Sequence, residues 1–239
     1  MAETLEMFAQ PQRVLMVFAH PDDAEYGASA AVAAWTRQGA EVAYLLLTAG
    51  EAGMQIPPAE VAPIRALEQR AACDVVGASE LTILNHPDGM LEANLDLRRD
   101  IARVIRQFKP DVVVTGTWQL EPGWGLNHAD HRAVGIATVD AVRDADNTWV
   151  FPELAANEEL PKWGATWLLA TGDPNPTVAV EVTEGDVAKA VASLEAHEAY
   201  LAALPDHPKP AVFIPEILTG GGQAAGVEYA SVFRAWKLR

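Results

Sequence analysis

The sequence predicts an α/β protein with a Rossmann-like three-layer α/β/α arrangement and a mostly parallel sheet. Short apolar runs of strand length alternate with longer segments whose apolar residues recur at helical spacing. Such alternation is typical of β-α-β units, in which helices cover both faces of the sheet. Half of the 239 residues are hydrophobic, which is enough for a large core. We expect one domain over residues 1–239, because no clear linker and no internal repeat interrupts the chain.

The first part of the chain carries the alternation most clearly. Buried apolar runs predict strands at residues 13–19, 41–48, 81–84 and 111–115. Helical spacing predicts helices at residues 25–38, 64–75, 97–108 and around 133–141. Gly39, Gly77 and Pro110 provide stop signals for the first three helices. Because parallel sheets place their sites beyond the carboxyl ends of the strands, the loops of interest follow residues 19, 48, 84 and 115.

The remainder of the chain is less regular. We expect strands at residues 166–170, 178–182 and 228–236, and one long helix at 187–201. Residues 205–226 are rich in proline and glycine and include three consecutive glycines at 220–222. This composition predicts a mobile loop or a contact surface.

Charge and cysteine content exclude several classes of partner. The formal net charge is −16, and such an acidic surface disfavours nucleic acid and membrane partners. Cys73 is the only cysteine, so no intrachain disulfide forms, which suits a reducing compartment. With no signal-peptide pattern and no apolar run of membrane-spanning length, the expectation is a cytoplasmic protein. A homo-oligomer is compatible with the sequence.

The first candidate site follows the first predicted strand, at residues 19–25 (AHPDDAE). His20 and Asp23 are three residues apart in a turn, so an imidazole and a carboxylate can converge on one point. Zinc binds such nitrogen and oxygen ligands. Asp22 lies between them and is free for another task. Helix capping is the alternative explanation, but the position after a buried strand favours a metal site.

The second candidate site lies after the fourth predicted strand, at residues 127–131 (NHADH). His128 and His131 flank Asp130 at the start of a predicted helix, a pattern that packing explains poorly. Either histidine alone would more often be structural. Together with His20 and Asp23, His131 completes three candidate ligands. Three protein ligands and an open position are typical of catalytic zinc.

Five segments, taken in order, resemble the PIG-L/LmbE-like zinc de-N-acetylases. They are residues 19–25 (AHPDDAE), 48–53 (TAGEAG), 65–72 (RALEQRAA), 86–91 (HPDGML) and 127–135 (NHADHRAVG). The resemblance runs from about residue 14 to residue 153. It is weaker beyond, where residues 193–204 (SLEAHEAYLAAL) depart from the His-x-Ser-Gln pattern that is usual in the family. Family members deacetylate N-acetylglucosamine groups on inositol, thiol-precursor or antibiotic scaffolds, or cleave related amides.

The resemblance implies which residues bind the metal and activate water. It makes His20, Asp23 and His131 the ligands of one zinc ion per chain, and it makes Asp22 the general base. Iron(II) suits the same ligands. The chemistry agrees, because zinc acidifies water and polarises an amide carbonyl, and a carboxylate next to a ligand can take the water's proton.

The remaining roles implied by the resemblance concern the leaving group and the substrate. His128 matches the residue that stabilises the oxyanion or protonates the leaving amine, and Asp130 matches the carboxylate that orients this histidine. Arg65 and Asp88 fall in segments associated with substrate contact, and Glu51 lies in the loop that borders the metal.

The expected function is therefore zinc-dependent hydrolysis of an N-acyl group from a small, sugar-containing substrate. An amidase that cleaves a larger thiol S-conjugate would use the same residues. A metal-dependent sugar-binding protein without turnover would need neither Asp22 nor His128. A nucleotide-binding regulatory domain is disfavoured, because no glycine-rich phosphate fingerprint follows the first strand.

Other residues have structural explanations beside the functional ones. His86 echoes the first motif, and we expect it in the wall of the substrate site. Trp118 and Trp124 precede His128 and could either stack on a sugar or pack internally. His197 lies on an apolar helix face, where a core position is favoured over a pocket position.

Overall fold

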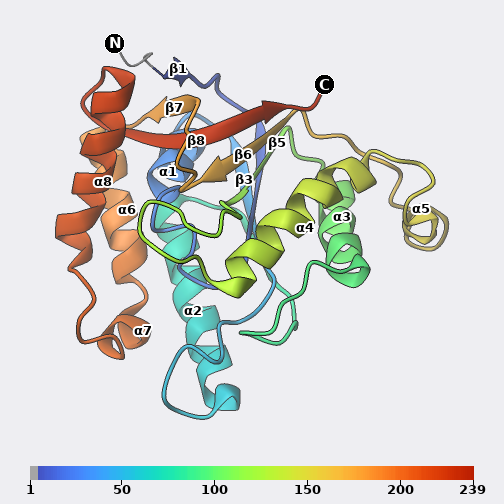
Figure 1. Cartoon of the computed structure of the whole chain (residues 1–239), viewed down its shortest axis with the longest axis horizontal. Helices are drawn as coiled ribbons and strands as arrows, with labels where there is room; N and C mark the ends of the chain where they lie inside the picture. The colour runs from blue at the N-terminus through green and yellow to red at the C-terminus, as the bar shows by residue number, and fades with distance from the viewer. Residues whose placement is uncertain (1–4) are drawn as a thin grey trace.

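The computed structural model describes residues 5–239, which form a twisted sheet between two layers of helices (Figure 1). The described residues contain eight strands in the order β1-β7-β8-β6-β5-β2-β3-β4. All neighbouring pairs are parallel except those of β8 with β6 and β7. The strand bounds are Glu6–Met7, Arg13–Phe18, Glu41–Leu46, Glu80–Ile83, Val112–Gly116, Trp167–Thr171, Val178–Glu181 and Ala230–Lys237 for β1 to β8. The mostly parallel α/β fold that the sequence predicts is confirmed.

The helices divide between the two faces of the sheet. On one face α3 packs against α4, and on the other α6 contacts α1, α2 and α8 (Figure 1). Two short helices, α5 and α7, complete the set in the described part of the chain. The helix bounds are Ser29–Arg37, Pro58–Val76, Leu95–Phe108, Ala129–Ala145, Pro152–Glu158, Glu184–Glu195, Glu198–Ala202 and Pro210–Ala225 for α1 to α8.

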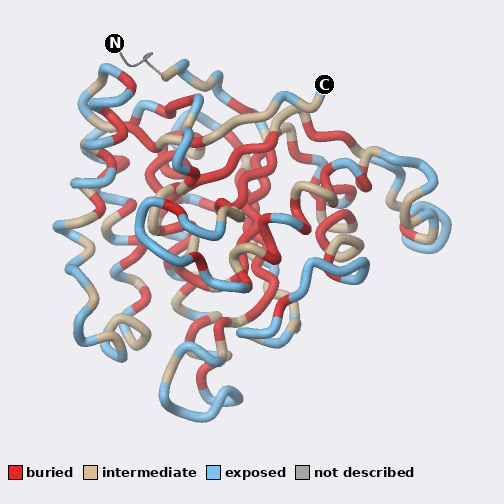
Figure 2. Tube along the Cα trace, in the orientation of Figure 1, coloured by how far each residue is buried: buried red, intermediate tan, exposed pale blue. Residues whose placement is uncertain are grey.

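Strand β2 explains why the first apolar run is uninterrupted. Its alternate side chains enter different cores: Val14 and Met16 pack beneath α1 and α6, while Leu15 and Val17 pack beneath α3 and α4. A strand covered on both faces needs apolar residues at every position. Figure 2 shows the resulting band of buried chain through the centre of the molecule.

The strand order fixes where a site can form. The chain runs outward from β2 to β3 and β4, and then returns to place β5 on the opposite side of β2. The boundary between β2 and β5 is therefore a topological switch point, where loops from neighbouring strands diverge and leave a crevice. The loop after β2 and the loop after β5 carry the two predicted motifs.

The prediction of a mobile loop at residues 205–226 is wrong for most of that segment. Residues Pro210–Ala225 form helix α8, with Pro210 in the first turn, where its missing N–H costs nothing. A Cβ atom at Gly221 or Gly222 would collide with backbone carbonyl oxygens of Ala230 or Glu228. The consecutive glycines therefore allow α8 to lie directly against the chain that enters β8.

Two predicted helices differ at their ends. The helix expected from residue 25 begins only at Ser29, because residues 21–28 form successive turns after β2. The long helix expected at 187–201 is interrupted at His197, which separates α6 from α7. Among residues 5–239, no helix has the length and apolar character of a membrane span.

Candidate active site

The turn after β2 is shaped by the two aspartates of the first motif. The Asp23 Oδ2 atom accepts hydrogen bonds from the backbone N–H groups of Ala19 and His20, at 3.1 and 2.9 Å. Asp22 has a left-handed backbone with φ of 82°. This conformation is unusual for a residue other than glycine and is common at functional sites. The turn thus presents adjacent carboxylates in different directions.

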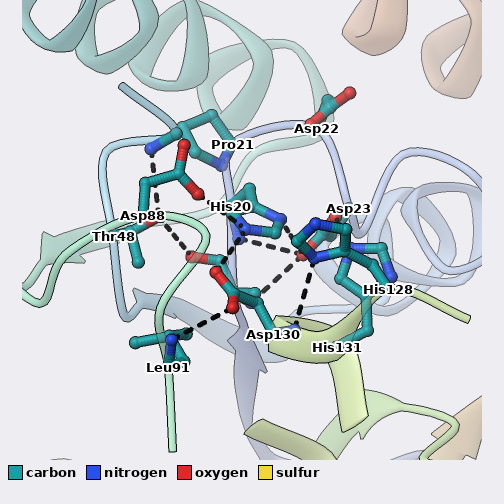
Figure 3. Close-up of polar contacts among 12 residues, drawn as sticks. His20, Pro21, Asp22, Asp23, Thr48, Asp88, Leu91, His128, Asp130 and His131 are labelled. Carbon is teal, nitrogen blue, oxygen red and sulfur yellow. Dashed lines mark hydrogen bonds and ion pairs between the residues drawn. The ribbon is translucent and has the colours of Figure 1, made fainter. Parts of the chain in front are cut away.

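Three predicted ligands converge on one point (Figure 3). Asp23 Oδ1 lies 3.0 Å from His131 Nε2, and Asp23 Oδ2 lies 3.5 Å from His20 Nδ1. Candidate ligand atoms of the three residues all lie within 4.8 Å of one another. On its other side, His131 Nδ1 lies 3.2 Å from Asn127 Oδ1, so Nε2 is left for the common point. Two nitrogens and a carboxylate are a donor set that suits zinc or iron(II).

The far side of His20 is held by two further carboxylates. His20 Nε2 lies 2.9 Å from Asp88 Oδ1 and 3.2 Å from Asp130 Oδ2. Burial lowers the pKa of His20, but Asp23, Asp130 and Asp88 outweigh burial and raise this pKa to about 12. Carboxylates that fix a ligand histidine in this way are common around protein metal sites. The cluster is therefore an electronegative pocket suited to a cation.

The resemblance implies that Asp130 orients His128, but in the structure the Asp130 carboxylate contacts His20. The same carboxylate also accepts hydrogen bonds from the backbone N–H groups of Gly89 and Leu91, at 2.7 and 3.1 Å. The Asp130 carboxylate forms no hydrogen bond with the His128 ring. The ring is contacted instead by the Asp130 backbone N–H, which donates to His128 Nδ1 at 3.3 Å. The carboxylate thus steadies a metal ligand.

His128 is the N-cap of α4 and faces the other two histidines. Its ring centroid lies 5.4 Å from that of His20 and 5.4 Å from that of His131. Because Nδ1 accepts the Asp130 N–H, the neutral ring carries its proton on Nε2. Burial, together with His20 and His131, lowers the pKa of His128. The geometry therefore favours a neutral imidazole with one N–H to donate.

Asp22 is buried and paired with an arginine. Arg65 donates from its Nη2 atom to Asp22 Oδ1 at 2.7 Å and to the Pro21 carbonyl at 2.6 Å. Figure 3 shows the Asp22 side chain apart from the cluster of His20, Asp23 and His131. Burial raises the pKa of Asp22 to about 7, and Arg65 limits the rise. A carboxylate with a pKa near neutrality is suited to exchanging protons.

The three residues predicted to contact substrate have different surroundings. Arg65 and Asp88 line the main cavity, although both are also engaged with site residues. Glu51 is absent from the cavity lining, and its carboxylate accepts a hydrogen bond from the Asp88 backbone N–H at 3.0 Å. Glu51 therefore supports the loop that carries Asp88.

The cavity around the cluster has a volume of about 840 Å³ and extends well beyond the predicted residues. The sequence analysis assigned no role to much of its wall, because most of these side chains belong to no motif and are separated by long stretches of chain. The missed lining residues include Tyr26, Thr171, Tyr200, Phe213, Ile217, Ser231 and Val232. Of these, Tyr200 stacks on Arg65, with the guanidinium carbon 3.7 Å from the ring centroid.

For the tryptophans and histidines that had both a structural and a functional explanation, the position in the fold decides between the two. Trp124 lines the cavity, whereas Trp118 packs on Trp236 with ring centroids 5.3 Å apart. The expectation that His86 lines the substrate site is wrong: it pairs with Asp100 at 3.0 Å and lies outside this cavity. His197 is fully buried, in agreement with a core position, and burial lowers its pKa to about 3.

Comparison with known families identifies the origin of this arrangement. Residues 15–142, which contain both motifs, match the family model described as GlcNAc-PI de-N-acetylase (PIG-L). The chain belongs to the PIG-L family. Deacetylases of this family are metal-dependent, and the histidine and aspartate cluster described above is this chain's candidate metal site.

Two relatives extend the PIG-L match. The chain is 32% identical to the 1D-myo-inositol 2-acetamido-2-deoxy-alpha-D-glucopyranoside deacetylase of Kineococcus radiotolerans, over 85% of this chain and 70% of that protein. It is 29% identical to the diacetylchitobiose deacetylase of Thermococcus kodakarensis, over 73% of this chain and 61% of that protein. Both relatives are named as deacetylases of sugar-containing substrates.

Solved structures show that the PIG-L fold spans the chain. The N,N'-diacetylchitobiose deacetylase of Pyrococcus horikoshii superposes with a TM-score of 0.82 at 24% identity, covering 95% of this chain and 84% of that one. The 4-carboxy-2-hydroxymuconate hydratase of Pseudomonas putida superposes with a TM-score of 0.72 at 19% identity, covering 95% and 97%. Because a hydratase shares the fold, function has to be argued from the site.

Proposed function

We propose that the chain is a zinc-dependent hydrolase that removes the N-acetyl group from a small substrate containing N-acetylglucosamine. The observation that carries the proposal is the meeting of His20, Asp23 and His131 beside Asp22, a buried carboxylate whose pKa is raised to about 7. Metal ligands and an adjacent base are the requirements of metal-assisted amide hydrolysis. Membership of the PIG-L family and the named activities of the relatives support the same reaction.

His20, Asp23 and His131 would hold the metal. When bound there, zinc supplies Lewis acidity toward the amide carbonyl and makes water more acidic. Asp88 and Asp130 keep the His20 ring in place through Nε2, so Nδ1 stays directed at Asp23. Iron(II) is the alternative metal, since the donor set suits both ions.

The chain's own acid and base groups divide the proton transfers. Asp22 takes a proton from the attacking water, because its raised pKa allows it to be ionised yet basic near neutral pH. The hydrogen bond from Arg65 Nη2 to Asp22 Oδ1, at 2.7 Å, fixes the orientation of this carboxylate. His128 donates the Nε2 hydrogen toward the negative charge that develops on the former carbonyl oxygen. Asp22, once protonated, can return its proton to the leaving amine.

The sugar is proposed to lie on the side of the cavity bordered by Asp88 and Gly53. The Asp88 carboxylate accepts a hydrogen bond from the Ala52 N–H at 2.7 Å, which fixes its position. A carboxylate held in this way can accept hydrogen bonds from sugar hydroxyls. Cleavage of a larger thiol S-conjugate would use the same groups, so substrate profiling has to separate the two reactions.

The test is a substrate screen on protein of defined metal content. Zinc-loaded and metal-free samples are incubated with N-acetylglucosamine, methyl N-acetylglucosaminides, diacetylchitobiose and S-substituted amide conjugates, and primary amine release is measured. We expect zinc-dependent release of glucosamine-type amines. Tight binding of the sugars without amine release would instead support a sugar-binding protein, and selective cleavage of the S-conjugates would replace the proposed substrate class.

A further inference from the structure

The main cavity has two unlike sides. The side formed by the loops after β2, β3 and β4 carries the ionisable groups, among them His20, Asp23 and Asp88. Another part of the lining is formed largely by α8 and β8, and its side chains include Phe213, Ile217 and Val232; Tyr26, from the loop after β2, and Trp124 also line the cavity. A volume of about 840 Å³ lies in the upper part of the range of small-molecule sites, which is about 300–1,000 Å³.

The apolar wall, defined here as Tyr26, Phe213, Ile217 and Val232, is left open by the fold. Tyr26 and Phe213 pack with ring centroids 5.7 Å apart. The Tyr26 hydroxyl is 2.8 Å from His207 Nε2, so the polar end of this ring is already engaged. Ile217 remains 44% exposed although it lines the cavity. Apolar side chains that line a concave site in this way indicate an apolar ligand group.

Most of the apolar wall lies outside the part of the chain that defines the family. Phe213, Ile217 and Val232 follow residues 15–142, which match the family model. The catalytic groups lie inside that segment. The wall is therefore suited to setting the substrate preference of this chain without altering the reaction.

On the basis of the proposed deacylation, we propose that the apolar wall binds an alkyl or aromatic group of several carbons on the substrate. A group attached on either side of the scissile amide could provide this chemistry: a long N-acyl chain, or an apolar aglycone on the sugar. Each methylene group that is removed from water at the wall raises kcat/KM by about fourfold at most. N-acetylglucosamine alone leaves the wall uncovered, so it is a poor substrate in this account.

The experiment compares four kinds of substrate on the zinc-loaded protein. Methyl N-acetylglucosaminide and hexyl N-acetylglucosaminide, each as both anomers, test the aglycone; N-acetylglucosamine and N-hexanoylglucosamine test the acyl chain. We expect at least a tenfold higher kcat/KM for one of the two hexyl-length substrates over its short counterpart. A gain with N-hexanoylglucosamine assigns the wall to the acyl chain, and a gain with the hexyl glycoside assigns it to the aglycone.

Two variants of α8 connect this preference to the wall. Ile217→Asp places a charge on it, whereas Val212→Asp places the same charge on the same helix at a residue that is 54% exposed and outside the cavity lining. We expect Ile217→Asp to reduce the gain, which is the ratio of kcat/KM for the long substrate to that for its short counterpart, at least fivefold. Val212→Asp should preserve the gain.

Equal kcat/KM for long and short substrates would overturn the inference while leaving the proposed deacetylation intact, and so would an equal effect of the two variants. Absence of amine release from all four substrates would contradict the proposed function itself. In that case, calorimetric binding of hexyl glucoside to the same three proteins still tests the wall. Binding that Ile217→Asp alone weakens supports the inference, and binding that is absent or insensitive to this substitution overturns it.

Discussion

The ionisable residues and the apolar wall of the cavity arise from the chain in different ways. His20 and Asp23 are three residues apart in one turn. His131 lies in the first turn of α4, on the other side of the switch point between β2 and β5. Phe213 and Val232 come from a helix and a strand that are brought together only by packing. Reactive groups need fixed spacing, which leaves a motif in the sequence. An apolar wall needs only shape, which many sequences provide.

The largest effect is expected from removing a metal ligand on the ionisable side. His131→Ala deletes the nitrogen that faces Asp23 Oδ1, and only His20 and Asp23 remain of the three proposed ligands. Zinc occupancy, measured by metal analysis after gel filtration, should fall well below one per chain, and amine release should fall to background. His86→Ala is the matched control, because His86 pairs with Asp100 outside the cavity. Stoichiometric zinc in His131→Ala would remove this residue from the ligand set.

A smaller loss is expected from His128, which faces the cluster and is not one of the three proposed ligands. His128→Ala removes a donor that would act on developing charge, so kcat should fall by roughly 10²–10³ with little change in KM. Zinc content should stay near one per chain. A rise in KM with an unchanged kcat would identify His128 as a substrate-binding residue, in contrast to its proposed role.

The Asp130→Asn substitution should show whether Asp130 positions the metal ligand His20 or acts in proton transfer through His128. Asp130→Asn weakens the contact with His20 Nε2, so zinc affinity should fall about 10–100-fold, as for other residues that orient metal ligands. Activity should recover when zinc is raised in the assay. Loss of activity that excess zinc does not restore would favour the alternative role, in which Asp130 acts through His128.

The site was more predictable from the sequence than its surroundings. Asp23 and His131 could be found because each follows a strand end and offers an atom that zinc prefers. The contact of Asp130 with His20 could not be found, because it depends on how the loop carrying Gly89 packs against α4. Ile217 had no signal at all, since an exposed aliphatic residue on a helix is ordinary.

The fold shows the same contrast between its two parts. Strand β2 and its neighbours were predictable from uninterrupted apolar runs, whereas α8 was mistaken for a loop because of its proline and glycine content. Local composition normally disfavours helix at consecutive glycines. Here the close approach of α8 to Ala230 requires a residue without a side chain at Gly221. Tertiary packing therefore decides the conformation of this segment.

The smallest predicted effect tests that packing through two neighbouring glycines. Gly221→Ala places a Cβ atom against the Ala230 carbonyl and should lower the free energy of unfolding by about 1–3 kcal/mol. Gly220→Ala meets nothing within 4 Å and should raise it by about 0.5–1 kcal/mol, because alanine favours the helix. Urea unfolding measures both. Equal effects of the two substitutions would show that α8 does not pack against β8 as described.

The central claim is that Asp22 acts as a base beside a metal site to which it does not belong, and Asp22→Asn tests it most directly. Since burial raises the pKa of Asp22 to about 7, wild-type kcat/KM should decline as the pH falls through about 7 and this carboxylate becomes protonated. In Asp22→Asn, parallel metal analysis and pH-dependent amine release should give one zinc per chain, a kcat lower by roughly 10²–10⁴, and no such decline. A folded Asp22→Asn protein that has lost its zinc, or one that keeps the wild-type rate and pH profile, would contradict the account.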